Sequence, residues 1–138
     1  MLDNGKRKPL LVVHPIQNAV KSNKKTMYQN LITTIDSISK TTIAEERKVV
    51  LQPLIDFIQT KIDTHQSIRL NFICTHNSRR SHLSQIWAQT MANHFGIQNV
   101  FCYSGGTEAT AMFPKVGETL TNQGFQIQQL SSDNNPVY

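Results

Sequence analysis

The chain has little of several features that would identify a common class of protein. Its 138 residues include only two cysteines, Cys74 and Cys102. Two cysteines do not make a disulfide-rich secreted scaffold or a zinc site. No apolar run approaches the ~20 residues that a membrane-spanning helix needs, so we expect no contact with a membrane. The length suits one modest domain with its own hydrophobic core.

Acidic residues are also scarce, since nine Asp and Glu stand against fourteen Lys and Arg, for a net charge of +5. Such an excess of basic residues reflects a mildly basic solvated surface more often than a site for an anionic partner, by roughly two to one. Aromatic residues do not interleave with the basic ones, so a nucleic-acid partner is not indicated. The five histidines are scattered without ligand spacing, and we expect neither a metal nor another cofactor.

The N-terminal segment contains "KRKPLLVV", basic residues followed by apolar ones. The apolar stretch is too short for the core of a secretory signal and is interrupted by Pro9, His14 and Pro15. We therefore interpret residues 1–26 as an irregular basic extension and expect a cytoplasmic protein.

Residues 27–66 have the spacing of two helices, which we expect to form a hairpin. The first would bury one face, made of Tyr28, Leu31, Ile32, Ile35 and Ile38. The second is predicted to begin at Thr42, which has capping-box spacing to Glu45, and to kink at Pro53. Its predicted buried stripe consists of Leu51, Leu54, Ile55, Ile58 and Ile62.

Residues 67–138 alternate between strand and helix patterns. Residues 68–73 and 99–104 read as strands, and the helix between them starts near Ser81 and ends at Gly96. A short helix follows from Pro114 to Gln123. This order predicts an α/β fold with a parallel sheet. With only two strands, one face of the sheet would be poorly covered.

Cys74 stands at the carboxyl end of the first strand, where open α/β sheets bind ligands. The backbone N–H groups of the following loop, "THNSR" (75–79), can point inward and bind a tetrahedral oxyanion at the helix N-terminus. Arg80 would hold two of its oxygens. The same donors would lower the pKa of the thiol and make Cys74 a nucleophile. A free cysteine is also often a small buried hydrophobe, and the residues alone leave both interpretations open.

The segment "ICTHNSRRS" resembles the C-x5-R-S loop of the low-molecular-weight protein tyrosine phosphatases, a superfamily that includes the thioredoxin-type arsenate reductases. "YSGGTEA" (103–109) resembles the segment after this family's second strand, and the likeness runs from Leu70 to Leu130. The resemblance implies a partial three-layer fold of this type. It also implies that Cys74 is the nucleophile, that Arg80 binds phosphate and that Ser104 supports Asn77. The implied oxyanion loop comprises Thr75, His76, Asn77, Ser78, Arg79, Arg80 and Ser81, with Asn77 and Ser81 shaping it.

Several positions depart from the family pattern. His76 stands where many members have glycine, and Arg79 where many have a second cysteine. The family's general acid lies in an Asp-Pro pair, and this sequence has none; Asp133, in a polar turn, is expected to be solvent-exposed. The α/β unit therefore looks incomplete at its C-terminus. We expect it either to be a truncated member or to complete its sheet as a homo-oligomer.

Three functions follow as expectations. The first is a cysteine-dependent phosphatase that hydrolyses phosphate monoesters, such as phosphotyrosine proteins, through a cysteinyl-phosphate. The second is arsenate reduction in the same loop, for which Cys102 is the one other thiol, although a buried structural role suits it better. The third is a non-catalytic oxyanion-binding module. His82 is expected at the surface, and Trp87 and Tyr103 in packed positions.

Overall fold

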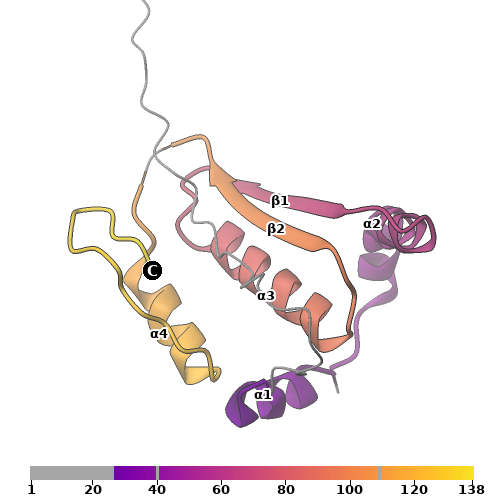
Figure 1. Cartoon of the computed structure of the whole chain (residues 1–138), viewed down its shortest axis with the longest axis horizontal. Coiled ribbons are helices and arrows are strands. Elements are labelled where there is room, and N and C mark those ends of the chain that lie inside the picture. Colours follow the sequence, from indigo (N-terminus) through magenta and orange to yellow (C-terminus); the bar gives the residue numbers. More distant parts are fainter. Residues whose placement is uncertain (1–26, 40, 109) are drawn as a thin grey trace, which may run out of the picture.

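The computed structural model describes residues 27–39, 41–108 and 110–138 (Figure 1). The predicted extension at residues 1–26 lies outside the described residues. Helices and strands follow along the chain as α1 (Gln29–Ser39), α2 (Glu45–Asp63), β1 (Ile68–Cys74), α3 (Arg80–His94), β2 (Val100–Gly106) and α4 (Pro114–Asn122). The α/β class is confirmed, and each strand and helix falls within a few residues of its predicted position.

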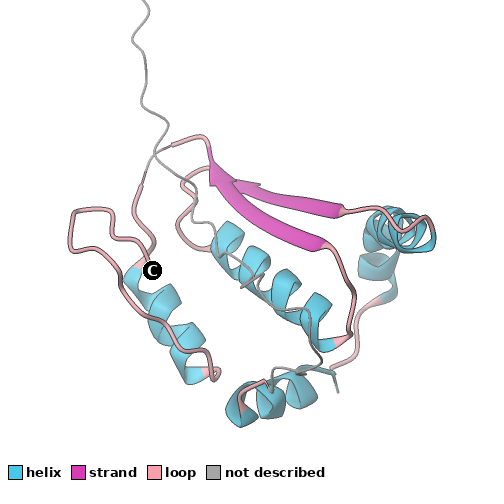
Figure 2. Ribbon diagram, viewed as in Figure 1, coloured by secondary structure: helices cyan, strands magenta, loops and turns pink. Residues whose placement is uncertain are grey.

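The two strands form a parallel sheet with α3 as the crossover between them, as predicted. Ile68 lies opposite Val100, and Cys74 lies opposite Gly106. Figure 2 shows α3 running along one face of the sheet. On the other face, the β1 residues Arg69, Asn71 and Ile73 are exposed in the described part of the chain. Because both strands end at the same edge, Cys74 and Gly106 meet at the mouth of the sheet.

Two small cores hold the α/β unit together. Between sheet and α3, the buried residues are Ile68, Ala92, Val100 and Cys102. The second core joins α4 to α3 and the C-terminal segment through Met112, Val116, Leu120, Leu83, Ile86, Phe125, Ile127 and Tyr138. Trp87 of α3 packs edge-on against Phe125, with ring centroids 5.3 Å apart, which agrees with its predicted packing role.

The two N-terminal helices are present but do not pack on each other as the expected hairpin. Of the predicted buried face of α1, Leu31 and Ile35 are buried, whereas Tyr28 and Ile38 are exposed. The helix is tied to the turn after α4, where the hydroxyl of Thr34 donates to the carbonyl of Gln123 at 3.0 Å. A side chain at Gly124 would come within 2.5 Å of the Leu31 nitrogen, so glycine permits this close approach. Figure 1 shows α1 and α2 on different parts of the molecule.

The predicted buried stripe of α2 is wrong, because the helix has no buried residue. Only Ile58 and Ile62, near its C-terminal end, pack against the sheet core. Leu54 and Ile55 remain exposed, since the rest of the helix extends away from β1. The predicted start at Thr42 is also wrong: the helix begins at Glu45, and the residue before it makes no side-chain capping bond. None of the helices in the described part of the chain has the length and apolar character needed to cross a bilayer.

Candidate functional site

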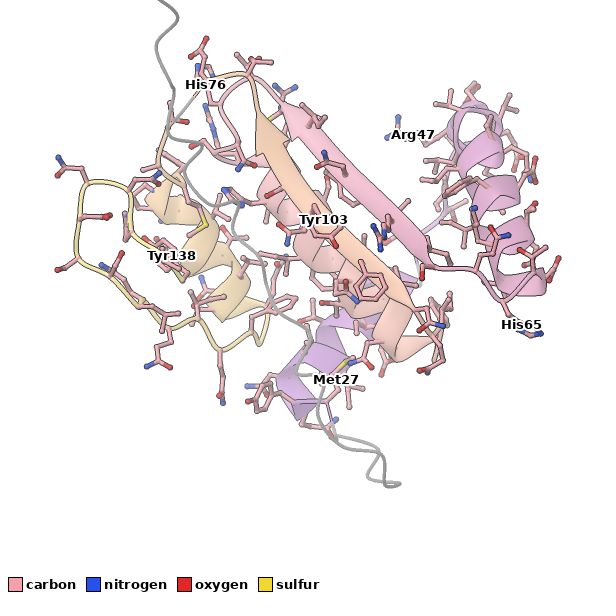
Figure 3. The ribbon with its side chains drawn as sticks, turned by 45° about the horizontal axis from the view of Figure 1, so that its top comes forward. Met27, Arg47, His65, His76, Tyr103 and Tyr138 are labelled. Atoms are coloured by element: carbon pink, nitrogen blue, oxygen red, sulfur yellow. The ribbon has the colours of Figure 1, made fainter. Side chains whose placement is uncertain are left out.

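The site is built at the carboxyl edge of the sheet, where β1 turns into α3. Cys74 is the last residue of β1, and Arg80 is the first residue of α3. Between them runs the anion loop, residues 75–79. Figure 3 shows His76 of this loop at the end of the sheet, far from His65 beyond α2. The residues predicted for the oxyanion loop therefore follow the cysteine directly: residues 75–79 form the connecting loop, and Arg80 and Ser81 begin α3.

The backbone of the anion loop takes a form that most side chains disfavour. Asn77 has φ +43, in the left-handed region that asparagine tolerates better than most residues. The loop also lies very close to β2. A Cβ at Gly106 would come within 2.6 Å of the Asn77 nitrogen and 2.8 Å of the Thr75 carbonyl oxygen. Glycine at this position therefore lets the loop fold back over the end of the sheet.

The sulfur of Cys74 faces several hydrogen-bond donors. Its Sγ lies 3.2 Å from the Ser81 hydroxyl oxygen, and that hydroxyl donates to Asn77 Oδ1 at 2.7 Å. The Ser81 hydroxyl and the backbone N–H groups of Ser81, Ser78 and Asn77 lower the pKa of Cys74 to about 7, against the opposing effect of burial. A large share of Cys74 is therefore thiolate at neutral pH.

Ser81 has one hydroxyl proton for two neighbours. When Cys74 is a thiol, its S–H can donate to Ser81 while Ser81 donates to Asn77. When Cys74 is a thiolate, the Ser81 proton can turn to the sulfur. The serine can thus follow the charge of the sulfur within the contacts observed.

Ser104 and His82 lie differently from what the sequence indicated. The resemblance implies that Ser104 supports Asn77, yet its hydroxyl oxygen lies 3.3 Å from His82 Nδ1. His82 was expected at the surface, and this is wrong: only 4% of it is exposed. It belongs to a polar face of α3 that also includes Gln85 and Gln89. Gln89 bonds to the backbone of β2, where it donates to the Val100 carbonyl and accepts from the Cys102 N–H.

A signal for His82 was present in the sequence. His82, Gln85 and Gln89 recur at helical spacing, beside the apolar positions of the same helix. The apolar stripe by itself predicts a different buried face. The buried residues of α3 are instead Ser81, His82, Gln85 and Ala92. Ser81 is buried against the side-chain amide of Asn77, and His82 against the hydroxyl of Ser104.

The segment after β2 forms one wall of the site. We call it the rim segment, residues 107–108 and 110–113. The Glu108 N–H donates to the Thr75 carbonyl at 2.9 Å, and the Thr110 hydroxyl donates to the His76 carbonyl. His76 Nε2 lies 2.9 Å from Glu108 Oε2, with both side chains more than half exposed. The His76 side chain, at the position where many family members have glycine, therefore lies at the exposed rim of the site beside Glu108.

Farther along, the rim segment holds the second half of the loop. The Phe113 N–H donates to the Ser78 carbonyl at 3.0 Å, and the Ser78 hydroxyl donates to the Ala111 carbonyl at 2.9 Å. The Arg79 guanidinium lies over the Phe113 ring, 5.1 Å from its centroid. Hydrogen bonds thus connect the loop to the rim segment at Thr75, His76 and Ser78.

Loop and rim segment together line an open pocket of about 540 Å³. The pocket lining combines two arginines, a half-buried thiol and hydroxyl groups. This combination suits an anion that carries an organic group. The pocket residues are Cys74, His76, Ser78, Arg79, Arg80, Thr110 and Phe113.

Cys102 is placed in the core rather than in the pocket. It is 6% exposed, and burial raises its pKa to about 11. It lies opposite Leu70, four positions before Cys74, which corresponds to ~13 Å at the ~3.3 Å rise of a strand residue. A disulfide needs Cα atoms within about 7 Å, so these two thiols cannot bridge without moving the strands.

The other predicted features lie away from the site. Asp133 is exposed in a turn, where its Oδ1 accepts from the Asn135 N–H. Within the described ranges, no three His, Cys, Asp or Glu side chains are grouped so that they could hold a metal ion.

Comparison with known proteins identifies one family. The model of the family described as low molecular weight phosphotyrosine protein phosphatase matches residues 69–136. The match begins in β1 and includes the anion loop, α3, β2, the rim segment and α4. No curated protein and no solved structure matches the chain.

Proposed function

Because the chain belongs to the low-molecular-weight phosphotyrosine phosphatase superfamily, we propose that it hydrolyses phosphate monoesters at Cys74. One observation carries the proposal. Cys74 has its pKa lowered to about 7 by the Ser81 hydroxyl and three backbone N–H groups, in a pocket that also contains Arg80. These are the features that a thiolate nucleophile and its oxyanion substrate both need.

Binding of the phosphoryl group would use the backbone of the anion loop and the two arginines. The N–H groups of Asn77, Ser78 and Ser81 face the sulfur and would face the phosphoryl oxygens next to it. Arg80 begins α3, so its guanidinium and the helix N-terminus would act on the same charge. The phosphorus would then lie in line with Sγ.

In the first chemical step the Cys74 thiolate attacks phosphorus. An S–P bond forms, the P–O bond to the leaving group breaks, and the leaving oxygen takes a proton from water. In the second step water attacks the cysteinyl-phosphate, the S–P bond breaks, and inorganic phosphate and the thiolate are released. The Ser81 hydroxyl lies 3.2 Å from Sγ and can stabilise the thiolate as it leaves. We assign no residue of this chain as proton donor to the leaving group.

The rim of the pocket favours aromatic esters. Phe113 is 46% exposed at the pocket, and Arg79 lies over its ring. An aryl group on the bound phosphate could pack against this pair, since aromatic rings favour stacked or edge contacts. General acid help is worth about 10²–10⁴-fold, so aryl phosphates, whose leaving groups need little protonation, should be the best substrates. We therefore propose phosphotyrosine proteins or related aryl phosphates.

Arsenate reduction is the second candidate. Arsenate is a tetrahedral oxyanion like phosphate, and the same loop donors would bind it. The position of Cys102 weighs against a mechanism within one chain, because it lies ~13 Å along the sheet from Cys74 by strand rise. An external thiol would have to release arsenite from Cys74. A third candidate, an oxyanion-binding module without turnover, predicts phosphate affinity and no trapped intermediate.

Location and assembly complete the proposal. A low-pKa thiol survives best in a reducing compartment, which supports a cytoplasmic location. In the described residues each strand pairs with only one neighbour, so each has a free edge. A second copy of the chain in a homo-oligomer could cover such an edge, and so could another segment of polypeptide.

The test is hydrolysis of p-nitrophenyl phosphate by the wild type, Cys74→Ser and Cys102→Ser. Turnover should be lost only with Cys74→Ser, and vanadate and arsenate should inhibit competitively. Cys102→Ser is the matched control, because it removes the one other thiol without touching the pocket. A folded wild type without turnover would contradict the phosphatase. Arsenite formed from arsenate only with added thiol would then identify the reductase.

A further inference from the structure

A buried histidine connects β2 to the anion loop, and the proposed reaction does not use it. His82 is the third residue of α3 and is 4% exposed. Its Nδ1 lies 3.3 Å from the hydroxyl oxygen of Ser104, which is fully buried on β2. Burying an imidazole is costly unless its nitrogens are hydrogen-bonded. The partners of this ring therefore indicate what it is for.

The second partner of His82 is the backbone of Asn77 in the anion loop. That hydrogen bond raises the pKa of the imidazole, so the ring is the donor and the Asn77 carbonyl the acceptor. Burial has the larger effect and lowers the pKa, which leaves the ring neutral at neutral pH. A neutral imidazole has one nitrogen that donates and one that accepts. One ring can thus serve both Asn77 and Ser104.

Asn77 is the residue of the loop that most needs support. Its φ of +43 is unfavourable for a residue with a side chain. Its N–H group is one of those that lower the pKa of Cys74, and its Oδ1 accepts from Ser81, which contacts the sulfur. A change at Asn77 would therefore reach the sulfur by two routes.

We propose that His82 is a positioning residue, which holds Asn77 in its left-handed conformation so that the loop donors keep facing Cys74. The imidazole bridges a rigid point, the buried hydroxyl of Ser104 on β2, and the strained loop residue. It touches neither the substrate nor the sulfur in this arrangement. The proposal deepens the proposed function of the site, but its main readouts are thiol ionisation and oxyanion binding, which do not require turnover.

The test compares His82→Gln and His82→Leu with His94→Gln. His94 lies on the same helix and is exposed, so its replacement controls for a changed histidine on α3. Two quantities are measured in each protein: the pKa of Cys74, from the pH dependence of its alkylation, and the affinity for vanadate. Cys102 does not interfere, because burial raises its pKa to about 11.

With His82→Leu, we expect the pKa of Cys74 to rise by about one unit. Well below that pKa, the thiolate fraction would then be about tenfold smaller. The affinity for vanadate should also fall about tenfold. His82→Gln should recover part of both losses, because an amide can also donate and accept. His94→Gln should match the wild type. A folded His82→Leu protein with the wild-type thiol pKa and vanadate affinity would overturn the proposal.

If both His82 variants fail to fold, Ser104→Ala provides the measurement. This substitution removes only the hydroxyl that anchors the ring. We expect a smaller rise in the pKa of Cys74 and a smaller loss of vanadate affinity than with His82→Leu. Unchanged values in folded Ser104→Ala would then overturn the proposal. Failure of the phosphatase is a separate outcome: the wild type would show a low thiol pKa and bind vanadate, yet release no phosphate from an ester.

Discussion

The mouth of the sheet and its core contain the same chemical group in opposite conditions. Cys74, at the end of β1, has a pKa lowered to about 7, whereas Cys102, inside β2, has a pKa raised to about 11. At the mouth, one hydroxyl and three backbone N–H groups face the sulfur. In the core, the thiol is buried among apolar side chains such as Ile68, and burial penalises its charge. The comparison teaches that the Ser81 hydroxyl and the backbone donors at the strand end, not the cysteine itself, create the nucleophile.

The largest expected effect is the difference in reactivity between the two thiols. Only a thiolate is alkylated at a useful rate, so the rate at Cys74 should rise as the pH climbs through about 7 and fall below it. Cys102 stays protonated until much higher pH, and its rate at pH 7.5 should be smaller by roughly 10³-fold or more. Iodoacetamide labelling followed by peptide mass spectrometry measures both. Equal labelling of the two cysteines in folded protein would break the comparison.

The next effect concerns the glycine that lets the loop approach β2. Gly106→Ala places a methyl group within 3 Å of the Asn77 nitrogen and the Thr75 oxygen, so the loop must move. A shift of about 1 Å at a reacting group can cost 10²-fold, and we expect at least about that loss in kcat/KM. Gly105→Ala is the control, because its Cβ would meet only Asn71 and Ile73 at 3.8 and 3.9 Å. Similar activity in both variants would show that the close contact does not position the loop.

A smaller effect is expected from the hydroxyl beside the sulfur. Ser81→Ala removes the largest contribution to the lowered pKa of Cys74, so this pKa should rise and kcat should fall about tenfold at pH 7. Raising the pH should restore part of the lost kcat, because the Cys74 thiolate then forms without the help of the Ser81 hydroxyl. Ser84→Ala, on the exposed side of α3, should change neither quantity. A pH profile of kcat/KM for the two variants decides the point.

The smallest effect is expected at the exposed pair on the rim. His76 and Glu108 are 2.9 Å apart, but both side chains are more than half exposed. Such pairs contribute ~0–1 kcal/mol, so Glu108→Gln should change stability by less than about 1 kcal/mol and activity by less than about threefold. Thermal unfolding and p-nitrophenyl phosphate turnover measure the two. A loss as large as that of Ser81→Ala would mean that the pair belongs to the reacting centre.

The elements and the place of the loop could be predicted from the sequence because they follow from local rules. The strand-like runs at 68–73 and 99–104, the glycine after α3 and Pro114 at the start of α4 each have a direct structural meaning. Parallel pairing then brings Cys74 and Gly106 to one edge. These features need no knowledge of distant contacts.

The misplaced residues depend on partners that only the folded chain brings together. His82 is buried because Ser104 and the Asn77 backbone supply hydrogen bonds, although histidine next to a loop usually reads as a surface residue. In α2, Leu54 and Ile55 have the spacing of a buried stripe, but no element of the described chain covers them. Periodicity predicts which face is apolar, and packing decides whether that face is covered.

The most direct test of the central claim is to trap the covalent intermediate. The wild type, quenched rapidly during hydrolysis of an aryl phosphate, should carry one phosphoryl group on the peptide that contains Cys74. Cys102→Ser should carry the same group, and Cys74→Ser should carry none. Turnover with no phosphoryl group on Cys74 at any quench time, undiminished in Cys74→Ser, would contradict the account.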